Sequence, residues 1–336
     1  MADVRLGTVL PGFAALAAVA VAAHLLAAQL PYVNALVLAV AMGALLANLF
    51  DLPSSLDAGI ERHDLLLETG IVLLGASIPL GALVDTGGVV VALVLATVAF
   101  GILLVEVLAR WVVPVSRHEG SLLAAGASIC GVSAVVAVGR SIDADRETLA
   151  YVAGAVLLFD AVTLLVFPVL AAPLGLPDRV FGVWAGLAMF STGPVAAAGF
   201  AVSAEAGKWA TITKLARNAL IGAVAVGYAM AYARQRETTG PSTLAERAGE
   251  VWRQFPKFLV GFALVALVAN AGVLTAGQVA LVESASAWLF ALAFAGVGFS
   301  IRLGRMREAG VGPVAVLLVY LLVVGTLALV VVSALL

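Results

Sequence analysis

The stretch GASICGVSAVVA (residues 126–137) decides how this sequence folds. It lies within a long apolar run, where lipid favours an unbroken helix, yet it is dense in glycines and small polar side chains. These are Gly126, Ser128, Cys130, Gly131 and Ser133. Non-helical backbone at membrane depth is tolerated only where it is buried in protein or lines a water-filled cavity. We therefore expect an interrupted helix that lines a cavity; the alternative is close helix packing through small residues.

The composition is that of a membrane protein. Of 336 residues, 63% are hydrophobic and 11% are charged, and the mean hydropathy is +1.14, whereas soluble domains are about half apolar and a quarter charged. Apolar runs long enough to cross roughly 30 Å of hydrocarbon recur along the chain. The sequence predicts an all-α polytopic protein in which residues 1–336 form a single transmembrane transporter domain. A net charge of −2 argues against a nucleic-acid partner.

Charges and Pro/Gly clusters divide the chain into about eleven transmembrane helices. The predicted spans are 9–30, 33–50, 64–84, 87–113, 120–141, 147–172, 180–203, 207–233, 255–274, 284–302 and 312–335. Of the 18 Lys and Arg residues, thirteen then fall on the N-terminal side of the membrane and three on the other. By the positive-inside rule, the N-terminus is cytoplasmic and the C-terminus is outside, in a multi-pass protein of the cell (plasma) membrane. Residues 234–257 are expected to be a cytoplasmic linker with a short amphipathic helix between the first eight and last three spans.

Two segments are similar to each other and indicate an internal repeat. SIPLGALVDTG (77–87) matches SIRLGRMREAG (300–310), and the copies lie seven spans apart, so they run in opposite directions. Inverted repeats with discontinuous helices are typical of secondary transporters. The alternative is chance recurrence of small residues at span ends.

A second similarity joins residues 126–137 to GLAMFSTGPVAAAG (186–199). In the second segment Ser191 and Thr192 supply hydroxyl groups, and Pro194 removes a backbone donor, which predicts a second interruption. The two segments would be parallel if both crossed the membrane, so either both line one cavity or one is re-entrant. The sequence leaves open whether the second broken helix is the seventh or the tenth span.

Three ionisable residues lie inside predicted spans. Lys214 and Arg217 are one turn apart on one face, and Asp160 lies near the middle of the sixth span. Charges at this depth face the bundle interior and mark transport pathways, and two neighbouring cations suit an anion. The alternative is a structural ion pair between Asp160 and one of the cations.

The sequence argues against several other functions. No phosphate-binding glycine-rich loop is present, no residue set has metal-ligand spacing, and no serine nucleophile has a histidine base in the membrane plane. We therefore expect no metal, no cofactor and no enzymatic activity.

Several motifs resemble the YeiH-type family of sulfate exporters. They are LLETGIVLLGAS (66–77), GASICGVSAVVA, GLAMFSTGPVAAAG, ATITKLARNAL (210–220) and FPKFLVGF (255–262). The resemblance covers residues 60–310 and implies a secondary transporter with the fold of sodium/proton antiporters and bile-acid symporters. Phe190 and Ser191 replace a His-Asp pair of that family.

The leading hypothesis is a secondary transporter that exports a small anion, such as sulfate, sulfite or an organosulfonate, by alternating access. The expected substrate-binding residues are Ser128, Cys130, Gly131, Ser133, Ser191, Thr192, Lys214 and Arg217, with Asp160 in coupling or gating. H⁺ or Na⁺ is the candidate coupling ion, and the lipid bilayer is the other partner. A cation/proton antiporter of the same fold and a non-transporting membrane subunit are the alternatives; a homodimer is one candidate oligomeric state.

Overall fold

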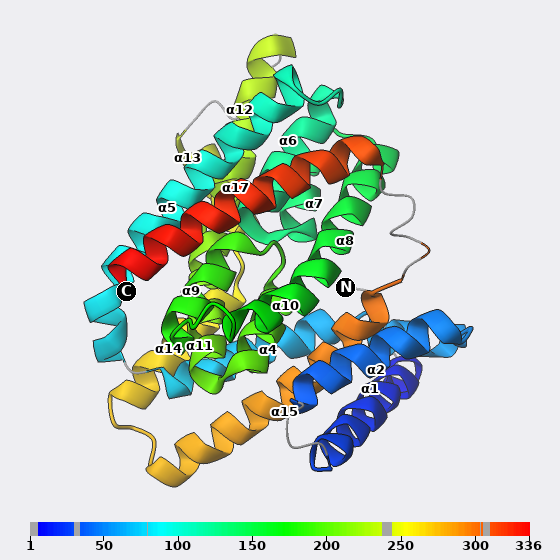
Figure 1. Ribbon diagram of the computed structural model, residues 1–336, viewed down its shortest axis with the longest axis vertical. Helices are drawn as coiled ribbons and strands as arrows, with labels where there is room; N and C mark the ends of the chain where they lie inside the picture. The colour runs from blue at the N-terminus through cyan, green and yellow to red at the C-terminus, as the bar shows by residue number, and fades with distance from the viewer. Residues whose placement is uncertain (1–5, 30–33, 79, 237–243, 303, 305–309) are drawn as a thin grey trace. The chain divides into compact units, whose positions relative to one another are not determined.

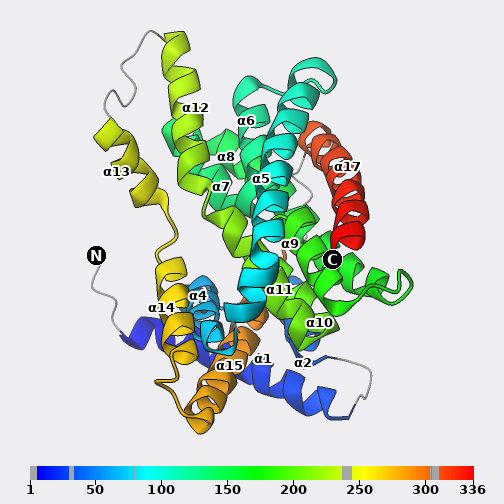
Figure 2. The same ribbon diagram turned by 90° about the vertical axis from the view of Figure 1, so that its left-hand side faces the viewer.

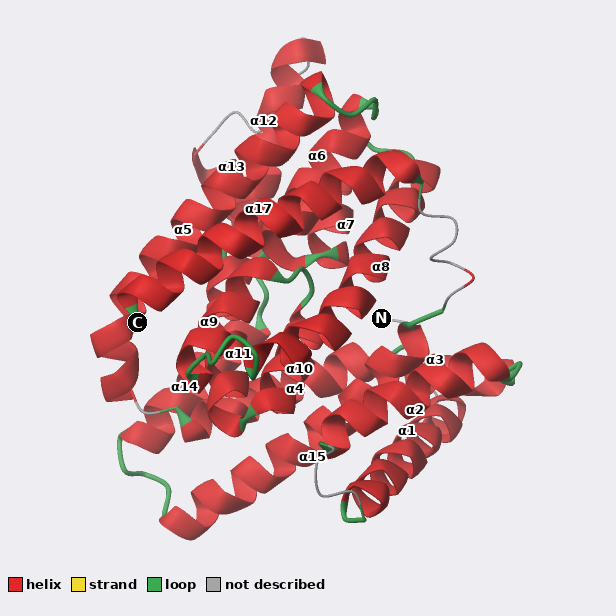
Figure 3. Ribbon diagram, in the orientation of Figure 1, coloured by secondary structure: helices red, strands yellow, loops and turns green. Residues whose placement is uncertain are grey.

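The computed structural model describes residues 6–29, 34–78, 80–236, 244–302, 304 and 310–336. Within these ranges the ordered secondary structure is helical and no strand is present (Figure 3), which confirms the all-α class. Six described helices are long and apolar enough to cross a membrane, and a bent pair brings the number to seven. The chain is thus a multi-pass membrane protein.

The chain divides into two compact units, which are described separately. Unit 1 comprises residues 1–85 and 257–303, and unit 2 comprises residues 86–256 and 304–336. The copies SIPLGALVDTG and SIRLGRMREAG lie where the chain passes between the units. Residues 79, 303 and 305–309 of these copies, and 237–243 of the predicted linker, lie outside the described residues.

Unit 1 is built around one long helix, α15. Its elements are α1 (Leu6–Ala27), α2 (Ala35–Leu49), η1 (Ser54–Leu56), α3 (Asp57–Ile60), α4 (His63–Leu74), η2 (Gly75–Ser77), α14 (Phe258–Asn270) and α15 (Ala276–Ser300). Helices α2 and α4 pack against α15, and α14 packs against α4 (Figure 1). Leu16, Ala39 and Phe299 belong to one buried cluster that joins α1, α2 and α15.

The predicted third span, 64–84, ends earlier than expected. Helix α4 stops at Leu74, a 3₁₀ turn follows, and Ile78 has extended backbone angles. The next helix, α5, starts at Leu80, before the residue 87 expected for the fourth span. The tenth span, by contrast, is the unbroken helix α15.

Unit 2 contains the remaining elements. They are α5 (Leu80–Trp111, mostly in this unit), α6 (Arg117–Ala125), the π-helical turn η3 (Gly126–Cys130), α7 (Val132–Ser141), α8 (Arg146–Ala171), α9 (Asp178–Ala188), α10 (Thr192–Val202), α11 (Ala204–Asn218), α12 (Ile221–Arg236), α13 (Leu244–Gln254) and α17 (Val311–Leu335). Helix α17 packs against α8 and α9, and α13 lies beside α12 (Figure 2). Ser116 and Glu119 form a capping box at the start of α6, a local signal that fixes where this helix begins.

The predicted fifth span, 120–141, is a helical hairpin. The interruption expected in GASICGVSAVVA is confirmed, because η3 ends at Cys130 and α7 starts at Val132. The two arms then run in opposite directions. Gly126, after the end of α6, lies against Val135 near the start of α7, and Gly139 near the end of α7 lies against Leu122 within α6. The two helices are therefore antiparallel. Residues 117–141 therefore do not form one crossing helix.

The predicted seventh span, 180–203, is also interrupted. Helix α9 ends at Ala188 and α10 begins at Thr192. The break precedes Pro194, which lies in the first turn of α10, where a missing amide leaves no intrahelical bond unmade. In an unbroken helix this proline would remove the hydrogen bond to the carbonyl of Phe190 and clash with it, so the break lies where Pro194 requires one.

The direction of α9 follows from its contacts with α11. Gly182 lies against Ala206, and Gly186 lies against Thr213. The residue numbers of the contacting pairs rise together along the two helices, so α9 runs parallel to α11.

Helix α10 runs the other way along α11. Thr192 is hydrogen-bonded to Asn218, and Gly199 lies against Gly207. The residue number rises along α10 as that of its partner falls along α11, so α10 is antiparallel to α11 and hence to α9. Residues 178–202 form a second helical hairpin, which places the second broken element in the seventh predicted span and not in the tenth.

Candidate functional site

The tips of the two hairpins meet inside unit 2. We call residues 128–133 the first tip and residues 189–194 the second tip. Gly131 has φ 65° and ψ −132°, a conformation open to glycine and strained for other residues. A β-carbon at this position would also overlap Ser191 Oγ. Gly131 is therefore needed both for the turn and for the contact between the tips.

Arg217 of α11 joins both tips. Its Nε donates to the carbonyl of Ser128 at 3.0 Å and Nη2 to that of Ala127 at 2.7 Å. Its Nη1 contacts the carbonyls at the end of α9, those of Gly186, Leu187 and Met189, at 2.7–2.9 Å. The side chain is fully buried. One guanidinium thus satisfies carbonyl groups that have no intrahelical partner at two helix C-termini.

Lys214, one turn earlier on α11, makes the same kind of bridge. Its Nζ donates to the carbonyl of Ile129 at 2.6 Å and to that of Met189 at 3.1 Å. It is also fully buried. A helix C-terminus carries about half a negative charge, so both cations lie where the two first arms, α6 with η3 and α9, present negative ends.

Asp160 of α8 lies at the opposite, N-terminal end of an arm. Its Oδ1 accepts a hydrogen bond from the amide of Ser191 at 2.9 Å. Its Oδ2 is buried without a hydrogen-bond partner among the residues that the structure describes. The hypothesis of a direct ion pair with Lys214 or Arg217 is not met, since no such pair lies within 4.0 Å in the described part of the chain. Each of the three charged side chains is instead hydrogen-bonded to backbone groups at a helix end.

The two sides of this meeting point differ in exposure. Ser128 and Cys130, which precede the first turn, are buried, whereas Ser133 is exposed and both Ser191 and Thr192 are half-buried. The residues predicted to bind substrate therefore fall into two groups. Those at the starts of α7 and α10 reach the surface, and those in η3, at Gly131 and on α11 are buried.

Two further polar residues near the tips escaped the sequence analysis. Asn218 Nδ2 donates to Thr192 Oγ1 at 2.9 Å, and Asn218 Oδ1 is buried with no partner among the described residues. Tyr320 of α17 is fully buried, and its ring centroid lies 5.7 Å from that of Phe190 in the second tip. Asn218 is part of the motif ATITKLARNAL (210–220), directly after Arg217, and that position was the available signal. Tyr320 lies far from both tips in the sequence and belongs to no motif.

Glu106 lies in a separate polar network, at the other end of α5. It forms an ion pair with Arg110, one helical turn further along α5, at 2.7 Å. Glu106 Oε1 also accepts hydrogen bonds from Ser121 at 3.0 Å and from Tyr228 at 2.7 Å. The carboxylate therefore ties α5 to α6 and α12.

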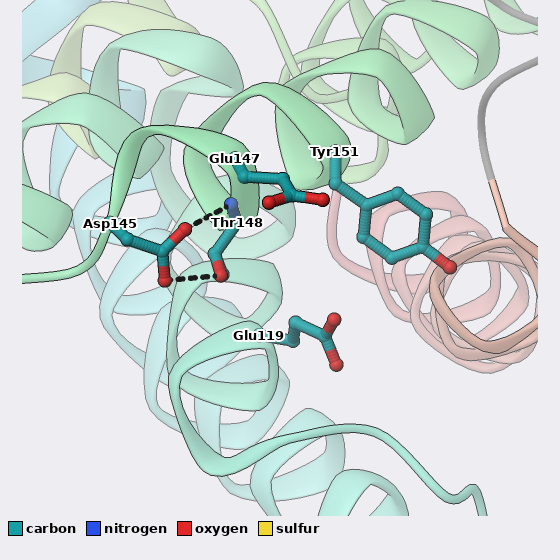
Figure 4. A pocket seen from close by; sticks show the side chains of 5 residues that line it. All are labelled: Glu119, Asp145, Glu147, Thr148 and Tyr151. Carbon is teal, nitrogen blue, oxygen red and sulfur yellow. Dashed lines mark hydrogen bonds between the residues drawn. The ribbon is translucent and has the colours of Figure 1, made fainter.

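A pocket of about 440 Å³ lies beside the starts of α6 and α8 (Figure 4). It is lined by Glu119, Asp145, Glu147, Thr148 and Tyr151. Asp145 caps α8 through the amide and hydroxyl of Thr148, each at 2.8 Å, and these hydrogen bonds lower the pKa of its carboxyl group. The pocket contains no tip residue, so it is distinct from the meeting point of the hairpins.

These features define a multi-pass helical membrane protein in which two hairpin tips meet beside buried charges. The chain belongs to the family described as Conserved hypothetical protein 698, which matches residues 11–317. It is 32% identical over 311 residues to a UPF0324 membrane protein of Nitratidesulfovibrio vulgaris, with 90% of this chain and 86% of the relative covered. It is 30% identical over 313 residues to the UPF0324 membrane protein TauZ of Paracoccus denitrificans, covering 92% and 90%. The resemblance to the YeiH-type family is thereby confirmed. No solved structure matches this chain.

Proposed function

We propose that this protein is a secondary transporter of a small anion, such as sulfate, sulfite or an organosulfonate, and that the anion binds between the hairpin tips. One observation carries the proposal: two helix N-termini, those of α7 and α10, meet on the accessible side of a buried cluster of two cations and one carboxylate. The chain's role is then transport and not catalysis.

The charges at the meeting point favour an anion. With Lys214, Arg217 and Asp160 ionised, these side chains carry one net positive charge. The partial charges of two helix C-termini and two helix N-termini cancel one another in this sum. A buried positive charge attracts an anion more strongly than the same charge in water does.

The backbone at the tips supplies donors for such a ligand. The first amides of a helix have no intrahelical partner, and together with the helix dipole they bind oxyanions. At α7 these are the amides of Val132 and Ser133, and at α10 those of Thr192 and Gly193. The hydroxyl groups of Ser133, Ser191 and Thr192 lie beside them. Lys214 and Arg217 then attract the anion by charge and do not contact it, because their hydrogen-bond donors are already bonded to carbonyl groups at the C-terminal ends of the first arms.

The helix directions fit an inverted repeat in which both hairpins are re-entrant. The hairpin of α6 and α7 enters from one face, α8 crosses, and the hairpin of α9 and α10 enters from the other face. The crossing elements are then nine: α1, α2, α4, α5, α8, α11 with α12, α14, α15 and α17. The helix after each hairpin packs on the second arm of the other, α8 on α10 and α12 on α7. This symmetry accounts for the similarity of residues 126–137 and 186–199.

The positive-inside rule supports this arrangement more strongly than eleven crossings. Arg140 and Arg146 join the cytoplasmic side, and Arg179 leaves it. Fourteen cations then lie on the cytoplasmic side, and two, Arg179 and Lys208, on the other. The N-terminus stays cytoplasmic and the C-terminus outside, as expected for the plasma membrane.

A second candidate function is cation/proton exchange. The free Oδ2 of Asp160 favours it, because a buried carboxylate oxygen without a donor can take a proton or Na⁺. In that case Lys214 and Arg217 neutralise the negative helix ends.

Flux into proteoliposomes tests the proposal. We expect saturable uptake of labelled sulfate, sulfite or a short organosulfonate, coupled to H⁺ or Na⁺. The variant Val132→Pro removes one tip amide at a helix position where proline is tolerated, and Val132→Ala is its matched control. The anion KM should rise by about tenfold in the proline variant, the loss of one charge-assisted hydrogen bond, and stay near wild type in the alanine variant.

Other outcomes would overturn the proposal. Sodium-dependent proton exchange without anion flux would favour the second candidate function. Absence of any flux, together with a stably co-purifying partner protein, would indicate a non-transporting subunit. Equal anion KM values in the two Val132 variants would remove the tip amides from the site.

A further inference from the structure

Two asparagines of unit 1 make matching contacts at opposite ends of the sequence. Asn48 Nδ2, at the end of α2, donates to the carbonyl of Ile301 at 2.6 Å and to its own helix at Ala44 O, 2.8 Å. Asn270 Nδ2, at the end of α14, donates to the carbonyl of Ile78 at 2.8 Å and to its own helix at Ala266 O, 2.8 Å. We call these two arrangements the asparagine clamps.

The surroundings of the clamps match as well. The asparagines end the sequences ALLAN (44–48) and ALVAN (266–270). Their targets follow a serine whose hydroxyl donates three residues back, from Ser77 to Leu74 O at 3.0 Å and from Ser300 to Val297 O at 2.7 Å.

A glycine packs equivalently in each copy. Gly75 lies against the carbonyl of Phe262 and the amide of Ala266. Gly298 lies against the carbonyl of Val40 and the amide of Ala44. The contacts of the two copies therefore agree in backbone packing and hydrogen bonding, which chance recurrence of small residues does not explain.

The partners are exchanged between the copies. Asn48 comes before SIPLG in the chain but bonds the isoleucine of SIRLG, and Asn270 bonds the isoleucine of SIPLG. Ile78 and Ile301 each lie shortly before a point where the chain passes to unit 2, after residues 85 and 303. Each clamp thus holds a backbone carbonyl directly after a helix end, next to a connection between the units.

We infer that Asn48 and Asn270 are a symmetry-related pair of positioning residues that set the balance between the inward-open and outward-open states. The inference rests on the proposed inverted-repeat transporter. In such a protein the pseudo-twofold axis lies in the membrane plane and exchanges the two faces. The same operation exchanges the two clamps. We assign each clamp a preference for one of the two states, and by this symmetry the other clamp has the same preference for the opposite state. Loss of one clamp then shifts the balance in the direction opposite to loss of the other, and loss of both restores it.

Cysteine accessibility measures this balance without any substrate. Cys130 is the only cysteine, so Ser133→Cys in a Cys130→Ser background places one exposed thiol at the first tip. The parent is labelled with a membrane-impermeant maleimide in right-side-out and in inside-out vesicles, and the ratio of the two rates is recorded. Asn48→Ala, Asn270→Ala and the double variant are compared. Thr69→Val is the matched control, because among the described residues the Thr69 hydroxyl bonds only within α4, to Leu65 O at 2.7 Å.

We expect each single variant to shift the ratio by about fivefold, the effect of one hydrogen bond of ordinary strength. The shifts should be opposite in direction, and the double variant should return close to the parent ratio although it melts at the lowest temperature. A merely structural role would lower the melting temperature of all three variants without this reversal.

Two outcomes overturn the inference alone: single variants that shift the ratio in the same direction, and single variants that leave it unchanged. Labelling of the parent and of every variant from one face only is a different result. It would overturn alternating access, and with it the proposed function.

Discussion

Gly131 and Ser191 lie in contact, although 60 positions separate them in the sequence. Each is in the turn of its own hairpin, so this contact holds the starts of α7 and α10 together. The lack of a side chain at Gly131 is what allows the approach. The distance between the two helix N-termini, and hence the size of the anion that the proposed site admits, depends on this pair.

Gly131→Ala should abolish transport while the protein still inserts into the membrane. The new β-carbon meets Ser191 Oγ, and a positive φ at alanine adds strain of about 2 kcal/mol. Anion flux and thermal melting in detergent check this. Gly175→Ala, at another glycine with positive φ but with open space around it, is the control and should retain flux. A fully active Gly131→Ala would show that the tips need not touch.

Arg217→Met should destabilise unit 2 by about 3 kcal/mol, because removal of a buried charged donor leaves its acceptors unpaired. Arg217→Lys should also lose transport, since an ammonium group lacks the planar fork that reaches both tips. Arg253→Met, which removes an exposed partner of Glu250, should leave both properties unchanged. Melting curves and flux measure these effects. Normal flux in Arg217→Met would contradict the assignment.

Asp160→Asn should separate the two candidate functions. The amide oxygen still accepts from Ser191 N, so the second tip should stay in place, but the negative charge near Lys214 is gone. For an anion transporter the KM should fall several-fold and flux should lose its dependence on pH. For a cation/proton exchanger the same variant should abolish exchange. Asp160→Ala, which also removes the hydrogen bond, should melt at a lower temperature in either case.

Asp145→Ala should lower the melting temperature at neutral pH, and the difference from wild type should shrink under acid conditions. The hydrogen bonds from Thr148 lower the pKa of this carboxyl group below the usual value of about 3.9. Its contribution is therefore complete above that value and is lost as the pH falls through the lower, folded pKa. Asn is an equally good helix cap, so Asp145→Asn should melt close to wild type at neutral pH and show no such dependence. Equal melting of all three proteins at neutral pH would exclude a role for this cap.

The sequence predicted the positions of the breaks better than the path of the chain through them. Glycine and serine density around Gly131 marked the first interruption correctly. Both a kinked crossing helix and a reversal satisfy the same apolar pattern, because periodicity reports which residues face lipid and not the direction of the next turn. The interruption predicted from Pro194 was also placed correctly, since the proline lies in the first turn of α10, directly after the break.

The partners of the buried charges were harder to predict. Asp160 was the natural counter-charge for Lys214 and Arg217 in a sequence, where only side chains are visible. The structure pairs all three with backbone groups. Every residue type carries such groups, so the sequence does not show which carbonyl or amide is free at a helix end. The asparagine clamps did leave a signal, the recurrence of ALLAN as ALVAN, but a five-residue apolar match is weak until its contacts are seen.

The exchange of partners between the clamps also constrains biogenesis. Unit 1 is made from two distant parts of the chain, and Asn48 is synthesised long before Ile301 emerges from the ribosome. The early helices α1, α2 and α4 are therefore in the bilayer without their packing partner α15 while more than half of the protein is translated. Insertion of the last helices completes unit 1, so a chain truncated before α15 should be recognised by membrane quality control as unassembled, however well its hairpins have formed.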